Sequence, residues 1–179
     1  MERGLRLQVR LERLARQHRP LLRQFQSQEP TLEFYLQRLA LRHEEKDQIS
    51  TTWLALLGEA EQTRLAGFFT LAPASVTRRD LNTVSTLVTL PPYPIPGILL
   101  ARLAVDLRAQ GQGLGSYLFE AALARALELR YALMFRLLVT DALNEAALRF
   151  YTKRGLVALL SEGYPRRMVL DLKDLVSAP

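Results

Sequence analysis

The run Gln110-Gly111-Gln112-Gly113-Leu114-Gly115 constrains the fold most, because it lies between a continuous apolar segment and an amphipathic one. That order predicts a strand, a glycine turn and a helix. Glycines at alternate positions let a backbone approach a bulky anion, and the first amides of the following helix point towards it. The run therefore predicts a pyrophosphate-binding loop, although a helix that follows any tight turn often has glycines there as well.

The glycine spacing also excludes two common nucleotide-binding folds. Three glycines at positions i, i+2 and i+4 do not match the G-x-G-x-x-G of a dinucleotide-binding fold. The Lys-Ser/Thr pair of a P-loop is absent from the run as well. An anion bound here would have to be held in another kind of α/β fold.

Length and cysteine content limit the class of protein. A chain of 179 residues that is 49% apolar is long enough for one core and too short for two ordinary domains, so we expect a single domain over residues 1–179. No cysteine is present, and only His18 and His43 could offer imidazole ligands, so we expect no metal site. The sequence shows no signal core and no membrane span, which predicts a soluble, cytoplasmic protein without membrane contact.

The positive charge has two interpretations. The net charge is +6 at pH 7, and Lys46, Lys153 and Lys173 are the only lysines, so nearly all cations are arginines. Arginine binds phosphate in a bidentate manner, which favours RNA or a phosphate-rich cofactor. A host proteome that prefers arginine to lysine explains the same bias, so charge permits a nucleic-acid substrate without showing one.

Hydrophobic periodicity predicts a mixed α/β domain in the order β-α-β-β-β-α-β-α-β-β, with a short additional helix near Arg78–Leu81. We expect the strand Ile98–Val105 to be buried on both faces apart from Arg102, and the prolines from Pro91 to Pro96 to form a stiff approach to it. The other predicted strands are residues 5–11, Ile49–Leu57, Leu65–Leu71, Phe135–Val139, Leu156–Leu160 and Met168–Leu172, and the other helices are Pro30–His43, Leu114–Leu129 and Leu143–Lys153.

A second motif follows the glycine run about thirty residues later, Asn144-x-x-Ala147-x-x-Phe150-Tyr151-x-x-x-Gly155. Together with Arg102-Leu103-Ala104-Val105 before the turn, the two motifs resemble the acetyl-CoA binding pattern of the GNAT N-acetyltransferases. The resemblance implies the fold of that family, which is a central, mostly antiparallel mixed sheet of six or seven strands. That sheet is splayed at the cofactor strand and flanked by helices.

The resemblance also implies roles for single residues. Tyr151 would give a proton to the departing CoA thiolate, and Asn144 would bond the cofactor arm; seven residues apart in one predicted helix, they would share a face. A phenol of pKa about 10 protonates a thiolate of pKa near 8.5 only slightly uphill. The alternative for Tyr151 is packing against the sheet together with Phe150. The cofactor would be bound by main-chain groups, the pantetheine arm by Leu103, Ala104 and Val105 and the pyrophosphate by Gln110, Gly111, Gln112, Gly113, Leu114 and Gly115.

No general base is evident, because the central strand contains no glutamate and Asp106 falls just beyond its last apolar residue. An amine of low intrinsic pKa, such as an α-amino group near 7.7 to 8.0, is partly neutral at pH 7 and needs little help. A lysine side chain needs much more. The missing base therefore favours an α-amine as acceptor.

The resemblance is closest to the toxin acetyltransferases of bacterial toxin–antitoxin pairs. It implies acetylation of the α-amine of an aminoacyl-tRNA, neutralisation by a ribbon-helix-helix antitoxin, and a homodimer. Candidate contacts to the RNA are Arg78, Arg79, Arg102 and Arg154. The segments that carry this resemblance are Phe25–Leu36, Gly67–Leu71, Ser75–Val76, Tyr93–Pro96 and Leu100–Asp106.

Three alternatives remain open at this point. The acceptor could be a protein N-terminus or a small-molecule amine. The fold could serve as a noncatalytic CoA-binding or scaffold module, in which case changing Tyr151 would alter nothing. The chain could also be an RNA-binding protein that makes no use of CoA, whose affinity would fall steeply with salt.

Overall fold

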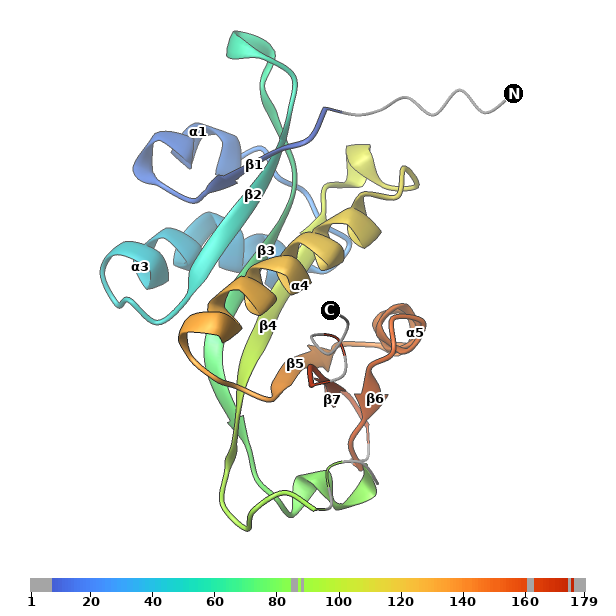
Figure 1. Cartoon of the computed structure of the whole chain (residues 1–179). Coiled ribbons are helices and arrows are strands. Elements are labelled where there is room, and N and C mark those ends of the chain that lie inside the picture. Colours follow the sequence, from blue (N-terminus) through green and yellow to red (C-terminus); the bar gives the residue numbers. More distant parts are fainter. Residues whose placement is uncertain (1–7, 85–86, 88, 161–162, 174, 176–179) are drawn as a thin grey trace. The chain divides into compact units, whose positions relative to one another are not determined.

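The computed structural model describes residues 8–84, 87, 89–160, 163–173 and 175 (Figure 1). The part of the predicted first strand that precedes residue 8 lies outside the described residues. In chain order the elements are β1 (Arg10–Arg13), η1 (Arg16–His18), α1 (Arg19–Leu22), α2 (Pro30–Phe34), η2 (Tyr35–Leu39), α3 (Ala40–Glu45), β2 (Thr51–Leu57), η3 (Ala60–Gln62), β3 (Arg64–Val76), η4 (Asp80–Thr83), β4 (Ile95–Val105), η6 (Leu107–Ala109), α4 (Leu114–Ala132), β5 (Leu137–Ala142), α5 (Glu145–Thr152), β6 (Val157–Ala158) and β7 (Arg166–Asp171).

The seven strands form one mixed sheet in the order β1-β2-β3-β4-β5-β7-β6. The ladders β1–β2, β5–β7 and β6–β7 are antiparallel, whereas β4 and β5 are parallel and α4 connects them. This arrangement confirms the predicted α/β class and the predicted mostly antiparallel sheet. The described ladder between β4 and β5 runs from Gly97↔Leu137 to Leu100↔Thr140, while β4 continues to Val105.

The chain divides into two compact units, Met1–Thr70 with Arg102–Ala121, and Leu71–Ala101 with Ala122–Pro179. The boundaries fall inside β3, β4 and α4. That residues 1–179 act as one domain therefore stays a proposal, and the two units are described separately below.

The core of the first unit lies between helices near the N-terminus and the strands that follow them. Pro30 occupies the first turn of α2, where its missing amide costs no hydrogen bond. The ring of Phe25 meets that of Phe68 edge to face at 5.4 Å, and Tyr35 stacks on Phe68 at 6.4 Å. Other buried members of this cluster are Leu14, Leu22, Leu36, Ala40, Leu54, Leu56, Leu65 and Ala104.

The core of the second unit gathers around the parallel strand pair. Ile95 of β4 packs in one cluster with Leu137 and Val139 of β5 and Val169 of β7. At the edge, Arg136 and Asp171 form a bidentate ion pair, with N–O distances of 2.5 and 2.7 Å. Buried residues from the end of β3 and from the segments between strands complete the cluster: Val76, Leu81, Leu87 and Leu159.

The structure corrects three local predictions. β4 is not buried on both faces throughout, because Arg102 is exposed and Leu103 and Val105 are half-buried. Leu129 was expected on the apolar side of the long helix, but it is 49% exposed. The short helix α1 was not predicted at all, because its four residues form too short a periodic segment to be recognised.

Gly67 allows α4 to approach the sheet within the first unit. A Cβ built at this position would lie 2.7 Å from Cδ1 of Leu118 and 2.9 Å from the main-chain oxygen of Ala104. We expect Gly67→Ala to destabilise the protein by about 1–3 kcal/mol, because a backbone atom of the predicted cofactor strand has to move. Urea unfolding followed by circular dichroism measures this, and an unchanged midpoint would contradict the close approach.

Candidate active site

The glycine run forms the turn between η6 and α4, as predicted. Gly111 and Gly113 have φ angles of +75° and +78°, which L side chains rarely adopt, and a Cβ built on either meets nothing within 4 Å. The amide of Tyr117 donates to the carbonyl of Gly113 over 3.2 Å and closes the first turn of α4. The amides of Leu114 and Gly115 precede that bond and have no acceptor within the helix. An open backbone turn at a helix start fits a bound diphosphate.

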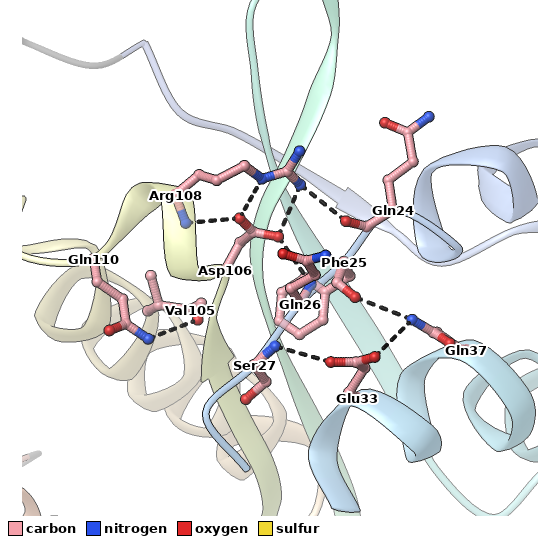
Figure 2. A network of polar contacts seen from close by, with 10 residues as sticks. All are labelled: Gln24, Phe25, Gln26, Ser27, Glu33, Gln37, Val105, Asp106, Arg108 and Gln110. Atoms are coloured by element: carbon pink, nitrogen blue, oxygen red, sulfur yellow. Dashed lines mark hydrogen bonds and ion pairs between the residues drawn. The ribbon is translucent and has the colours of Figure 1, made fainter. Parts of the chain in front are cut away.

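Asp106 fixes the start of this turn through a buried carboxylate (Figure 2). The side chain is 1% exposed and accepts the main-chain amide of Gln26 at 3.0 Å. It also accepts the amide of Arg108 at 2.9 Å and two guanidinium bonds from Arg108, from Nε at 2.8 Å and Nη2 at 2.9 Å. The guanidinium reaches further to the carbonyl of Gln24 at 2.9 Å. Asp106 and Arg108 therefore tie the segment after α1 to the end of β4.

The surroundings of Asp106 argue against its acting as a general base. Burial alone would raise the pKa of its carboxyl, but the hydrogen bonds from Arg108 and from the amides of Gln26 and Arg108 outweigh burial and lower that pKa. A carboxylate with both oxygens occupied and a lowered pKa is a weak proton acceptor. The sequence could not reveal this role, because Gln26 and Asp106 are eighty residues apart.

Two further side chains hold the same region together. Nε2 of Gln110 donates to the carbonyl of Val105 at 3.4 Å, and its Oε1 accepts from Gln28 at 3.0 Å. Glu33 of α2 accepts the amide of Ser27 at 3.1 Å and Nε2 of Gln37 at 3.4 Å (Figure 2). The side chain of Gln110 thus has a structural function, and only its main chain stays a candidate for the anion.

Tyr151 belongs to the second unit and is buried, with 7% of its surface exposed. Burial raises the pKa of Tyr151, although the hydrogen bond with Thr140 and the charge of Arg154 oppose the rise. The hydroxyl of Thr140, which bonds the phenol, also donates to the carbonyl of Leu100 at 2.9 Å. Burial thus favours the neutral, protonated form of the phenol.

Tyr151 also contacts Phe150, with ring centroids 5.1 Å apart in an edge-to-face arrangement. Phe150 is half-buried and carries the guanidinium of Arg154 over its ring at 3.5 Å. The ring of Tyr151 therefore packs as the alternative prediction expected, and its role as proton donor stays a prediction.

Asn144 does not share a helical face with Tyr151, which corrects the predicted helix Leu143–Lys153. The helix α5 begins at Glu145, and Asn144 is its N-cap with extended backbone. Its Oδ1 accepts the amide of Ala147 at 2.9 Å. Asparagine is among the preferred N-cap residues, so this function was readable from the sequence. A contact of Asn144 with the cofactor stays a prediction.

The four arginines predicted to contact RNA occupy separate surroundings. Arg102 is exposed and its guanidinium lies 4.9 Å from the centre of the Tyr35 ring, in the first unit. In the second unit, Nη1 of Arg78 donates to the carbonyl of Leu90, and Arg154 donates to the carbonyl of Phe150 at 2.7 Å. Arg79 is exposed beside η4. Contact of these four arginines with RNA stays a prediction.

A different set of cations does come together, and the sequence analysis missed it. Arg16, Arg19 and Arg23 line one groove with Arg38, Arg42 and Lys46. Their spacings in the sequence are i, i+3, i+7 in one segment and i, i+4, i+8 in the other, which is typical of side chains on one face of an α-helix. That regular spacing was the available signal.

Two absences are limited to the described residues. Within them, no helix is long and apolar enough to cross a membrane. The same residues contain no group of three or more histidine, aspartate or glutamate side chains that could hold a metal ion.

The comparisons with known proteins agree with this geometry. The sequence model of the Acetyltransferase (GNAT) family matches residues 13–156. The tRNA-acetylating toxin of Mycobacterium tuberculosis is 33% identical over 150 residues, which cover 84% of this chain and 85% of that protein. The structure of AtaT complexed with acetyl-methionyl-tRNAfMet has a TM-score of 0.81 at 26% identity, covering 93% of this chain and 96% of the other. AtaTR bound with AcCoA has a TM-score of 0.78 at 26% identity, with coverages of 93% and 95%.

Proposed function

The chain belongs to the GNAT acetyltransferase family, and we propose from this that it transfers the acetyl group of acetyl-CoA to the α-amine of an aminoacyl-tRNA. The substrate class is proposed from one observation: a tRNA-acetylating toxin is 33% identical to this chain over most of both chains. The likeness to AtaT complexed with acetyl-methionyl-tRNAfMet supports the same acceptor. The chain acts as one catalytic domain over residues 1–179.

Acetyl-CoA fits the residues of the first unit. Main-chain groups of Leu103, Ala104 and Val105 bind the pantetheine arm along β4, beyond the described ladder to β5. The open turn at Gly111 and Gly113 and the start of α4 hold the pyrophosphate. When bound, the thioester supplies an activated acetyl group. The likeness to AtaTR bound with AcCoA supports this assignment.

Tyr151 supplies the proton for the leaving thiolate. The phenol is protonated at neutral pH, and burial, which raises its pKa, extends that protonated range upward; the hydroxyl of Thr140 bonds the phenol. Asn144 orients α5 by capping it and bonds the cofactor arm. Because Asp106 is a weak proton acceptor, deprotonation is left to the low pKa of an α-amine.

The partners follow from the same proposal. An acetylated aminoacyl-tRNA cannot accept a peptide, so free activity is harmful and an antitoxin of the ribbon-helix-helix class is expected to neutralise it. The site of action is the cytoplasm, where charged tRNA is used. A homodimer is expected, and the exposed side chains of Tyr131 in the last turn of α4 and of Leu133 and Met134 just after it offer an apolar surface for it.

The test incubates the purified protein with acetyl-CoA and total charged tRNA, followed by mass spectrometry of the aminoacyl ends. We expect acetylated ends on one or a few tRNA species. Acetyl-CoA consumption with unmodified charged tRNA would redirect the assignment to a protein N-terminus or a small amine. Binding of CoA without turnover on any amine would indicate a noncatalytic module.

A further inference from the structure

The basic groove of the first unit contains more cations than its ion pairs neutralise. It has a volume of about 830 Å³, and its six cations, Arg16, Arg19, Arg23, Arg38, Arg42 and Lys46, face a single carboxylate, that of Glu45. Arg16 pairs with Glu45 at 2.6 Å, and Arg42 pairs with Asp47 at 3.0 Å. Among the described residues, no ion pair involves the other four cations.

The four remaining cations are directed to solvent. Arg19, Arg23, Arg38 and Lys46 are all exposed, and they come from the two helical segments that border the groove, η1–α1 and η2–α3. Like charges held along two facing helices repel one another unless an anion lies between them. Guanidinium groups in such a row match successive phosphates, since each presents a planar, bidentate donor set.

An aromatic side chain marks one end of this groove. A shallow hollow lined by Pro30, Glu33 and Phe34 adjoins the groove and shares Gln37 and Arg38 with it. Phe34 is 58% exposed, so the core does not account for it. A cationic track that ends at an exposed aromatic ring suits a polyanion with an unpaired base, because the ring stacks on the base while arginines bind the backbone.

The groove is connected to the predicted cofactor strand by a short segment. Arg23 is followed by Gln24, whose carbonyl accepts from Arg108, and by Gln26, whose amide donates to Asp106 (Figure 2). Gln37, which lines the groove, donates to the carbonyl of Phe25 at 3.0 Å. A ligand in the groove therefore lies against the segment that adjoins the end of β4.

We propose that this groove binds the sugar-phosphate backbone at the acceptor end of tRNA, with Phe34 stacking on an unpaired base. The inference rests on the aminoacyl-tRNA function proposed above and assigns that substrate a surface. It replaces the earlier set of Arg78, Arg79, Arg102 and Arg154 by cations that share one hollow. An acidic protein segment is the competing occupant, and the experiment separates the two.

The test compares two triple variants of the full chain with the same change of charge. The groove variant is Arg19→Gln, Arg23→Gln and Arg38→Gln, and the control is Arg64→Gln, Arg125→Gln and Lys173→Gln. Binding of uncharged tRNA is measured by fluorescence anisotropy over a range of KCl concentrations. We expect the groove variant to bind about 10- to 100-fold more weakly at 0.15 M salt, with a log–log salt slope smaller by about 2 to 3. The control changes less than about threefold.

Phe34→Ala provides the second arm. Its loss of affinity should be about tenfold with an unchanged salt slope, because stacking does not release counterions. Equal tRNA binding by the groove variant and the control overturns the inference, as does a wild-type protein that does not bind tRNA. Groove-dependent binding of tRNA that is never acetylated supports the groove and refutes the proposed function instead.

Discussion

Tyr151→Phe lowers the rate of acetyl transfer by about 10²- to 10⁴-fold, which is the usual contribution of a positioned general acid. The substitution removes only the hydroxyl and keeps the ring that packs against Phe150. The effect should appear in kcat, with little change in the KM for acetyl-CoA, because the proton is needed only as the thiolate leaves. Acetylation of charged tRNA under single-turnover conditions measures this loss.

The matched control is Tyr131→Phe, which removes a hydroxyl from a side chain that is 82% exposed. It should retain full activity. Thermal unfolding of Tyr151→Phe checks that the fold survives the loss of the Thr140 hydrogen bond, a change worth about 1 kcal/mol. Wild-type activity in a folded Tyr151→Phe variant would assign the proton transfer to another group or to water.

The pH dependence adds an independent readout. Because burial raises the pKa of Tyr151, the phenol stays protonated across the range in which an α-amine of pKa about 7.7 to 8.0 becomes neutral. The rate should therefore rise with pH through that range and remain flat up to about pH 10. A fall in rate between pH 8 and 9 would mean that an acid of lower pKa donates the proton.

Where the signal was local, the sequence predicted the fold well. The strand β2 and the glycine turn before α4 each arise from neighbouring residues, and the corresponding elements are present. The first strand begins at Arg10 and ends at Arg13, later than the alternation over residues 5–11 predicted, and residues 5–7 lie outside the described residues. The order β5-β7-β6 was not predictable in this way, because β7 inserts between two strands that precede it in the chain. Nor did any local pattern indicate that β3 extends to Val76.

The site shows the same division. The positive φ angles at Gly111 and Gly113 could be predicted from the sequence, because alternating glycines favour such angles. The basic groove could be predicted only in part. The spacing of the cations indicates which residues group together in each segment, but it does not show which two segments face each other. The burial of Asp106 was hidden, because its partner Gln26 belongs to a loop without periodicity.

Asp106→Asn should destabilise the protein by about 3 kcal/mol at pH 7, because it removes a buried charge that accepts four hydrogen bonds. The amide side chain offers one acceptor oxygen, and its nitrogen places donors against either the amide of Gln26 at Oδ2 or the amide of Arg108 at Oδ1. The matched control is Asp47→Asn, which breaks the exposed ion pair with Arg42 and should cost less than about 1 kcal/mol. Urea unfolding measures both losses, and equal losses would contradict a stabilising role for the hydrogen bonds of Asp106 with Arg108 and Gln26.

The difference in the free energy of unfolding between wild type and Asp106→Asn should shrink as the pH falls. The pKa of Asp106 is lower in the folded protein than in the unfolded chain, so its stabilisation is complete above the unfolded value of about 3.9. It is lost as the pH falls through the folded pKa, and the two unfolding curves should converge there. The hydrogen bonds of Asp106 hold the segment that leads into α4, so Asp106→Asn should also raise the KM for acetyl-CoA at neutral pH. Asp47→Asn should leave that KM unchanged. A stability difference that persisted undiminished into strong acid would mean that the asparagine acts through packing rather than through the lost charge.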